Sequence, residues 1–416
     1  ATTDYNFDAP NEPLNHDFDS VCQETIQQAA DKGYDALLDD HISDHQALFK
    51  RVALNLGDAG PIDMPTDERL KRVQSGEQDL GLEALYFQYG RYMLIASSRP
   101  GCLPANLQGL WNDRMEGPWN CDYHLNINIQ MNYWLSELTN LSECHEPFLD
   151  FVEHLVPDGQ VTAREVYDCR GFVAHHTTDL WLFTQPFGKV QYGMWPTGAG
   201  WSARHFMEHY RFTQDKSFLR ERALPILRES ALFFVDWLIR DPNTGEWVSG
   251  PSTSPENKFL VNGEGLNLSI GPTMDHQIIR GVFKDYLTTL ELLNIEEDLA
   301  EEVKAKLSGL AETKVGKDGR ILEWSLPFEE QSPGHRHISH LYGLHPGEEI
   351  HYQADALFEA SRKTIEGRLA AGGGHTGWSR AWIINFWARL LDAENAYENL
   401  QLLFKKSTVS NLFDTH

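Results

Sequence analysis

The sequence predicts an all-α fold in which antiparallel helix pairs form a ring and the loops between helices carry the functional residues. Apolar residues recur at helical spacing over most of the 416-residue chain. The segments between them are rich in Gly, Pro, Ser, His and Trp, which is typical of loops that present a site on a rigid scaffold. No strict sequence repeat is visible, and this argues against the motif-defined repeat solenoids.

Helical spacing predicts the elements in order along the chain. Two helices are expected within residues 21–52, separated near Gly33, and a loop rich in Gly, Pro and Asp follows at 57–66. The same spacing predicts further helices over 80–96, 130–138, 147–169, 201–212, 219–239, 277–293, 297–310, 354–369, 379–391 and 393–404. Residues 1–14 and the last ten residues, STVSNLFDTH, have the composition of loops.

Composition narrows the class of partner. The formal net charge is −26, whereas binders of nucleic acids and anionic membranes need a positive footprint, and uronic or sulfated polymers would be repelled. No run of about 18 apolar residues is present that could cross a bilayer. Aromatic residues make up 11 %, and neutral sugars stack on aromatic faces, although most aromatic residues belong to cores. A neutral substrate is therefore favoured, with neither nucleic acid nor membrane as partner.

Several site classes lack their sequence signatures. The cysteines are odd in number and show no CxxC spacing, so neither a disulfide framework nor a zinc cluster is indicated: Cys22, Cys102, Cys121, Cys144 and Cys169. The segment GGGHTGWSRAW contains neither GK[ST] nor GxGxxG, and HExxH is absent. GxSxG, the nucleophile elbow, is also missing. Nucleotide binding and serine-hydrolase chemistry are not indicated.

Histidines gather in two polar loops, GHRHISHLYGLH and AHHTTDLW: His335, His337, His340 and His345, then His175 and His176 with Asp179. A His-x-His pair could contribute to a metal site, which takes three or four such ligands. Arg336 lies inside the first cluster, however, and a cation beside a metal ion is unfavourable. Arg336 and His337 are therefore expected to donate hydrogen bonds to substrate hydroxyls, with Asp179 as a further substrate-binding candidate and no metal.

The segment YHLNINIQMNYW carries a carboxamide at every second position: Asn126, Asn128, Gln130 and Asn132. In an extended segment, residues two apart share a face, so Asn126 and Asn128 are expected to point the same way while Leu125, Ile127 and Ile129 face the core. Amides offer donors and an acceptor without charge, which suits the orientation of a water or a hydroxyl. Amides that only satisfy backbone groups in a tight loop are the alternative.

Glu256 lies in a turn, GPSTSPENK, whose prolines partly fix the backbone. A carboxylic acid held in such a turn is well placed to protonate a leaving oxygen if burial favours its neutral form. Taken alone, such a residue is more often part of a surface turn. Its place among other loops of similar composition favours a role in a site.

Seven segments together resemble, in chain order, the inverting α-L-fucosidase family of glycoside hydrolases, typified by the bacterial 1,2-α-L-fucosidases. They are LPANLQGLWND, HLNINIQMNYWLSELTNLSECHEPF, GPSTSPEN, GPTMDHQI, GHRHISHLYGLHPG, GGGHTGWSRAWIINFWARL and NLFDTH. The resemblance spans nearly the whole chain. It implies an (α/α)6 barrel preceded by a helical linker, which would place the linker at residues 1–58 and a barrel, incomplete at its C-terminal end, at residues 59–416. Neither of the family's flanking β domains is evident.

The resemblance also implies residue roles. Glu256 matches the family's general acid, and Asn126 and Asn128 match the pair that orients the attacking water. His124 matches a position that contacts the sugar in fucosidases and is Thr in related α-L-galactosidases. Arg336 and His337 match a sugar-binding segment. No metal or cofactor is implied.

One part of the family's machinery is not matched within these residues. The aspartate that activates the water lies, in the family pattern, in an Asp-Gly-Asn segment shortly after Asp-Thr-His, and this sequence ends at His416. We interpret Asp414 as a structural neighbour of that base. A C-terminal segment of the same protein is therefore an expected partner.

The leading hypothesis is an exo-acting, metal-independent, inverting α-L-fucosidase that removes terminal 1,2-linked fucose from fucosylated oligosaccharides or glycans. An α-L-galactosidase of the same family is the alternative. A catalytically silent sugar-binding fragment is a third reading, from a different functional class. A polysaccharide lyase using Tyr123 and His124 is disfavoured because lyases act on uronic acids and the chain is strongly acidic.

Overall fold

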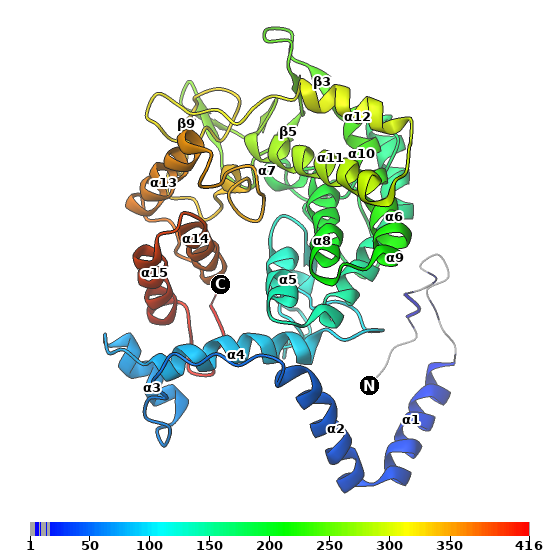
Figure 1. Ribbon diagram of the computed structural model, residues 1–416, viewed down its shortest axis with the longest axis vertical. Helices are drawn as coiled ribbons and strands as arrows, with labels where there is room; N and C mark the ends of the chain where they lie inside the picture. The colour runs from blue at the N-terminus through cyan, green and yellow to red at the C-terminus, as the bar shows by residue number, and fades with distance from the viewer. Residues whose placement is uncertain (1–4, 8, 10–13, 15–16, 416) are drawn as a thin grey trace.

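The computed structural model describes residues 5–7, 9, 14 and 17–415 (Figure 1). Most of the expected opening loop and His416 of the NLFDTH motif lie outside this range. Among the described helices, none combines the length and the apolarity needed to cross a membrane.

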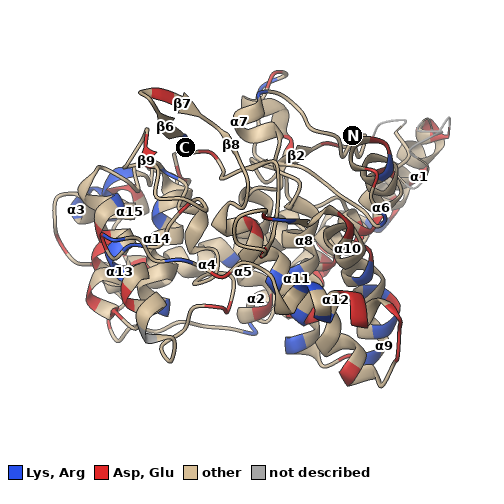
Figure 2. Cartoon of the chain, turned by 90° about the horizontal axis from the view of Figure 1, so that it is seen from above, with Lys and Arg blue, Asp and Glu red and all other residues tan. Residues whose placement is uncertain are grey.

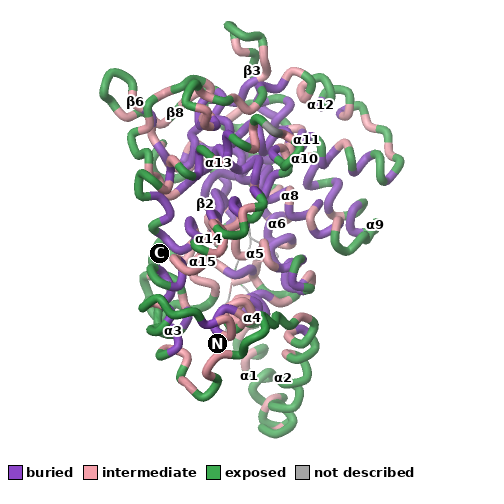
Figure 3. Tube along the Cα trace, turned by 60° about the vertical axis from the view of Figure 1, so that its left-hand side comes forward, coloured by how far each residue is buried: buried purple, intermediate pink, exposed green. Residues whose placement is uncertain are grey.

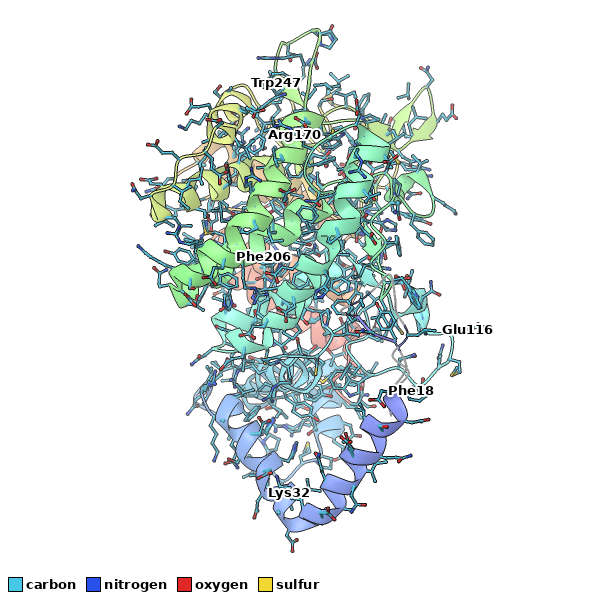
Figure 4. All side chains as sticks on the ribbon, turned by 90° about the vertical axis from the view of Figure 1, so that its right-hand side faces the viewer. Phe18, Lys32, Glu116, Arg170, Phe206 and Trp247 are labelled. Atoms are coloured by element: carbon cyan, nitrogen blue, oxygen red, sulfur yellow. The ribbon has the colours of Figure 1, made fainter. Side chains whose placement is uncertain are left out.

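The first two helices project from the rest of the molecule. Helix α1 (Phe18–Lys32) and helix α2 (Tyr34–Phe49) form a V at one end of the molecule, with α1 lying far from the helical body that holds Phe206 (Figures 1 and 4). Gly33 separates them at φ 77°, ψ 159°, a conformation that favours glycine, and this confirms the predicted break. Two ion pairs tie this end to the body: Arg99–Asp44 at 2.7 Å and Arg51–Glu143 at 2.8 Å.

The body is built mainly of helices, which confirms the predicted all-α class. The longer ones are α3 (Thr66–Gln74), α4 (Leu80–Ser97), α5 (Asn128–Leu138), α6 (Glu146–Tyr167), α8 (Gly198–Thr213), α10 (Leu224–Trp237), α11 (Thr273–Leu293), α12 (Leu299–Ser308), α13 (Asp355–Ala370), α14 (Gly377–Arg389) and α15 (Ala393–Lys406). Short helical turns join them: η1 (Pro118–Cys121), η2 (Ser142–Cys144), α7 (Val190–Gly193), α9 (Lys216–Phe218), η3 (Leu219–Ala223) and η4 (Ser339–Leu341).

Helix α8 lies at the centre of the packing. It contacts α5, α6, α10 and α11, and α14 packs against α15 as an antiparallel pair. Large buried aromatic side chains fill the space between these groups, among them Trp195, Trp201, Trp382 and Trp387. The buried part of the trace runs through the middle of the body, whereas α1 and α2 are mostly exposed (Figure 3). Within residues 17–415 the helices surround this core without closing a ring, as the expected incomplete barrel requires.

Helix α3 was not among the predicted helices. It carries few apolar residues, so helical spacing gave little signal. Leu70 and Val73 pack into a small core with Leu82, Phe404 and Leu412, and the acidic residues of its first turn and basic residues of its last turn suit the helix dipole. Arg69 of α3 donates to Asp79 at 2.6 Å, and Asp79 also caps α4 by accepting from the Leu82 backbone N–H at 2.9 Å. One carboxylate thus joins two consecutive helices.

Short antiparallel strands lie in the loops on one side of the helices. The pairs are β1 (Tyr123–His124) with β2 (Thr177–Thr178), β3 (Ile239–Arg240) with β4 (Trp247–Val248), β5 (Ser252–Thr253) with β8 (Leu268–Ser269), and β6 (Phe259–Val261) between β7 (Glu264–Leu266) and β9 (Glu329–Glu330). They fix the loops that carry the candidate site.

The prediction of an extended amide segment was wrong beyond His124. Strand β1 ends there, a turn follows, and Asn128 is already the first residue of α5. Leu125, Ile127 and Ile129 are buried as expected.

Candidate active site

Three residues predicted to belong to the site meet at the Glu256 carboxylate. Asn126 Nδ2 donates to Glu256 Oε1 at 3.1 Å, and Arg336 Nη2 donates to Oε2 at 2.6 Å. His337 Nε2 lies 3.6 Å from Oε1. The residues come from segments 130 and 80 positions apart, so the fold brings the amide segment, the SPEN turn and the HRH segment together as expected.

The backbone of the turn that carries Glu256 is held on both sides. Gln191 Nε2 donates to the Glu256 backbone carbonyl at 2.8 Å. The Ser339 hydroxyl donates to the Pro255 carbonyl. Within the turn, the Asn257 backbone N–H donates to the Ser254 carbonyl at 3.1 Å. The turn is therefore anchored to α7 through Gln191 and to η4 through Ser339. These contacts fix the backbone from which the Glu256 carboxylate extends.

The Glu256 side chain is partly reachable from solvent. It is 19 % exposed and Arg336 is 32 % exposed, whereas His337 is 3 % exposed. His337 also packs edge-on against Trp378 of α14, with ring centroids 4.8 Å apart. One side of the carboxylate is thus closed by protein and the other is open to a ligand.

Asn126 and Asn128 differ in setting. Asn126 is 2 % exposed and is fixed by its contact with Glu256, while Asn128 is partly exposed at the N-terminus of α5. The other two amides satisfy backbone carbonyls: Gln130 Nε2 donates to the Leu125 carbonyl at 2.7 Å, and Asn132 Nδ2 to the Asn106 carbonyl at 3.2 Å. The alternative reading of the amide segment therefore holds for Gln130 and Asn132.

His124 lies on β1 beside a buried histidine. Its ring centroid is 6.3 Å from that of His176, which in turn lies 5.0 Å from Tyr192. Burial lowers the pKa of His176 to about 4, the charge of His124 adds to this, and the carboxylate of Glu256 opposes it. The two histidines and Glu256 thus lie within electrostatic reach of one another, and His176 is neutral at pH 7.

Asp179 lies outside the hydrogen-bonded group at Glu256. It follows β2 and accepts from the Trp181 backbone N–H at 2.7 Å. Tyr123 pairs with Thr178 in the β1–β2 ribbon, so the next residues outward, Asp122 and Asp179, face each other. Burial raises the pKa of both carboxyls. Both line a hollow of about 600 Å³ together with Trp181 and Asn106. Its substrate-binding role remains a prediction.

The clustered histidines are mostly structural. His335 Nδ1 accepts from the His337 backbone N–H at 3.1 Å, and His175 Nδ1 lies 2.6 Å from the Thr184 carbonyl. Burial lowers the pKa of His175 to about 4, of His335 to about 2 and of His345 to about 3. These rings are therefore neutral hydrogen-bonding groups at pH 7.

A separate cluster lies at the junction of α5 and α8. Glu137, His145 and His209 bring their ligand atoms within 4.8 Å of one another, and this is the group in residues 17–415 that could hold a metal ion. Glu137 Oε1 lies 2.8 Å from Nδ1 of each histidine, which is a hydrogen-bond distance. His145 Nε2 lies 2.9 Å from His205 Nδ1. A carboxylate only accepts, so both Nδ1 atoms carry hydrogen, and His145 Nε2 is left to accept from His205.

Glu137→Gln is expected to destabilise the fold and to make it less sensitive to acid. Burial raises the pKa of Glu137, but hydrogen bonds from His145 and His209 outweigh it and hold the pKa at about 2, below the ordinary 4.5. Because the folded pKa is depressed, this stability is fully present above pH 4.5 and is lost as the pH falls toward 2. It amounts to about 3 kcal/mol.

Urea unfolding of both proteins at a series of pH values checks this. The difference in free energy of unfolding should be largest at neutral pH and shrink below pH 4.5. A difference that stays constant down to pH 3 would contradict a role for the Glu137 charge.

Asp414 lies at the N-terminus of α14. Its carboxylate occupies the space where a Cβ on Gly377 would stand, only 1.4 Å from that position. Burial raises the pKa of Asp414 to about 6. The next residue of α14, Trp378, packs on His337, so Asp414 lies beside a helix that contacts the site, and its role as a structural neighbour stays an interpretation.

Several residues that support the site were not predicted from the sequence. Ser339 and Asn257 lie inside segments already singled out, and their positions next to His337 and Glu256 could have suggested supporting roles. Gln191 lies in a segment without any special composition. Long-range contacts of this kind cannot be read from spacing.

Comparisons with a family model and with curated proteins point to the same family of glycoside hydrolases. Residues 33–416 match the description "Glycosyl hydrolase family 95 catalytic domain". The chain is 39 % identical over 411 residues to "Alpha-L-fucosidase 2" of Arabidopsis thaliana, covering 96 % of this chain and 48 % of that protein. It is 33 % identical over 405 residues to "Probable alpha-fucosidase A" of Aspergillus niger, covering 94 % and 50 %. The chain thus spans about half the length of the curated relatives it matches.

A solved structure supports the helical architecture. "Putative kojibiose phosphorylase from human microbiome" aligns with a TM-score of 0.55 at 10 % identity, covering 77 % of this chain and 48 % of that chain. At this identity the likeness shows the fold alone.

Proposed function

Since the chain belongs to the glycosyl hydrolase family 95 catalytic domain family, we propose that it forms the catalytic part of an exo-acting α-L-fucosidase. The substrate is a terminal fucose, 1,2-linked in an oligosaccharide or glycan, and the reaction proceeds with inversion. The names of the relatives from Arabidopsis thaliana and Aspergillus niger support the class of sugar.

The observation that carries the proposal is the setting of Glu256. Its carboxylate is held by Asn126 and Arg336, it is anchored through its own backbone, and it is still reachable by a ligand. Inverting hydrolysis needs a carboxylic acid on one side of the glycosidic bond and an activated water on the other. Glu256 supplies the first group.

The amide pair supplies the orientation of the water. Asn126 contacts the acid and Asn128 begins α5 two residues later, and in this proposal the pair orients a water that attacks the sugar from the face opposite the leaving oxygen. Neutral amides hold this water without repelling an acidic partner. The carboxylate that takes the proton from the water is expected, by the family pattern, in the segment that follows Asp-Thr-His.

Arg336 and His337 bind the sugar in this proposal. Arg336 is the more exposed of the two and can exchange its hydrogen bond to Glu256 for one to a sugar hydroxyl when substrate arrives. That exchange frees one oxygen of Glu256 to carry the proton that the leaving oxygen receives. The acidic net charge of −26 suits a neutral glycan.

His124→Thr is expected to weaken discrimination between L-fucosides and L-galactosides. His124 lies on β1 next to the amide pair, where it can meet the C5 substituent, a methyl in fucose and a hydroxymethyl in L-galactose. Loss of such a contact changes the ratio of the two kcat/KM values by about 10-fold. Hydrolysis of the two aryl α-L-glycosides by the protein in its full encoded length measures this ratio.

The control is His351→Thr, an exposed histidine in the loop before α13. It should leave the ratio unchanged. If the wild-type protein prefers the α-L-galactoside to the α-L-fucoside, the protein is an α-L-galactosidase and the proposed fucosidase function is wrong. If a folded protein binds fucose and cleaves neither glycoside, the site only binds sugar.

A further inference from the structure

A buried carboxylate lies directly beneath the turn that carries Glu256. Ser254 Oγ donates to Glu323 Oε1 at 2.8 Å, and Asn257 Nδ2 donates to Glu323 Oε2 at 3.3 Å. Ser254 stands two residues before Glu256 and Asn257 one residue after it. Glu323 therefore accepts from both sides of the proposed acid with its two oxygens.

Glu323 is itself fixed from the opposite direction. Arg368 of α13 donates to Glu323 Oε2 at 2.6 Å and lies 2.9 Å from Glu330 Oε2. The Glu323 backbone carbonyl accepts from the Thr273 N–H at 3.1 Å, at the start of α11. Glu323 is thus held at α11 through its backbone and at α13 through its carboxylate.

Contact with a substrate does not explain this arrangement. The side chains of Glu323 and Arg368 are each 2 % exposed. Ser254 and Asn257 are 0 % and 1 % exposed, so each needs its acceptor inside the protein. Burial raises the pKa of Glu323, with Arg368 opposing the shift, and the three donors around it favour the ionised form.

The other anchors of the turn act differently. Gln191 and Ser339 hold backbone carbonyls, of Glu256 and Pro255 respectively. Glu323 instead accepts from the side chains that flank the acid, with Glu330 Oε2 as a second acceptor for Asn257 Nδ2 at 3.0 Å, and these contacts bear on the orientation of the turn. Small rotations matter, because a displacement of about 1 Å in a catalytic group can cost about 100-fold in rate.

We infer that Glu323 is a positioning residue for Glu256: it holds the turn through Ser254 and Asn257 so that the acid faces the leaving oxygen. The inference rests on the proposed function and goes beyond it. Glu323 does not touch substrate in this account and acts only through the turn.

The test is Glu323→Gln, which keeps the side-chain shape but loses the second acceptor oxygen and the charge that pairs with Arg368. The protein in its full encoded length is assayed with 2′-fucosyllactose, whose sugar leaving group needs a proton, and with α-L-fucosyl fluoride, whose fluoride needs little help. For 2′-fucosyllactose kcat should fall about 10- to 100-fold with KM nearly unchanged, and for the fluoride it should change less than about 3-fold.

Asp285→Asn is the matched control. Asp285 is also a buried carboxylate next to an arginine, Arg211 at 3.1 Å, but it lies on α11 away from the turn. Its loss should affect both substrates equally. A Glu323→Gln protein that loses activity on both substrates to the same degree would overturn the inference, because the effect would then be general loss of structure.

A second measurement keeps the inference testable if wild type cleaves neither substrate, an outcome that would count against the proposed function alone. Hydrogen exchange of peptides covering residues 252–258 is compared with peptides from α8. Glu323→Gln should speed exchange in the turn by about 10-fold or more and leave α8 unchanged. Unchanged exchange in the turn would overturn the positioning role.

Discussion

Glu256→Gln lowers kcat on 2′-fucosyllactose by at least about 1000-fold while the affinity for the sugar stays within about 3-fold of wild type. Glutamine keeps the shape of the side chain and can still accept from Asn126 or Arg336, the donors that hold Glu256 at 3.1 and 2.6 Å. It has no proton that a leaving oxygen can take. Steady-state kinetics of the protein in its full encoded length, with calorimetric titration of the sugar, measures both effects.

The control for this variant is Glu264→Gln, which removes a carboxylate from the exposed strand β7. It should leave kcat unchanged. The α-L-fucosyl fluoride assay adds a second check, because a missing acid should hardly affect it. Retained turnover of 2′-fucosyllactose by a folded Glu256→Gln protein would remove Glu256 from the role of acid.

Asn126→Asp lowers kcat by at least about 100-fold and changes the pH dependence of the reaction. The substitution is nearly isosteric but places a second carboxyl group at 3.1 Å from Glu256 Oε1, where an amide donated before. Two carboxyl groups so close hold a shared proton more tightly, so the alkaline limb of the pH–rate profile should move to higher pH. The pair also loses the neutral donor that orients the water.

Asn55→Asp introduces the same charge at an exposed loop position and serves as the control. The Asn55 side-chain oxygen accepts from the Gly57 backbone N–H at 2.8 Å, which an aspartate also does. Its pH–rate profile should match wild type. If the profile of Asn126→Asp also matches wild type, the contact between Asn126 and the acid has no part in catalysis.

The charge distribution agrees with a neutral substrate. Acidic and basic residues are interspersed along the helices in the described part of the chain (Figure 2). Many of the basic groups are paired, as Arg170 is with Asp236 and Glu302, both at 2.8 Å.

Much of the helical framework could be predicted because burial imposes a period on the sequence. Helix α4 shows this well: it was expected at 80–96 and spans Leu80–Ser97. Helix α3 was missed because its buried face consists of only two apolar residues, Leu70 and Val73, while Arg69 on the same face pairs with Asp79. A helix of nine residues with so few apolar positions shows too little periodicity to be detected.

The candidate site was predictable only where residues lie close in sequence or match a family motif. Asn126, Glu256 and Arg336 were singled out in this way, and they meet in the structure. The amide alternation misled, because a strand of two residues is followed there by a three-residue turn and then by a helix. Glu323 lies 67 positions from Glu256, and nothing local marks a residue whose task is to hold the turn 254–257 from below.

The most direct test of the central claim is the anomeric form of the first fucose released. The protein in its full encoded length is incubated with 2′-fucosyllactose in an NMR tube, and the anomeric signals are followed before mutarotation mixes them. An acid at Glu256 acting with a water held by the amide pair predicts β-fucose first. Release of α-fucose first from the full-length protein would show retention and contradict the account.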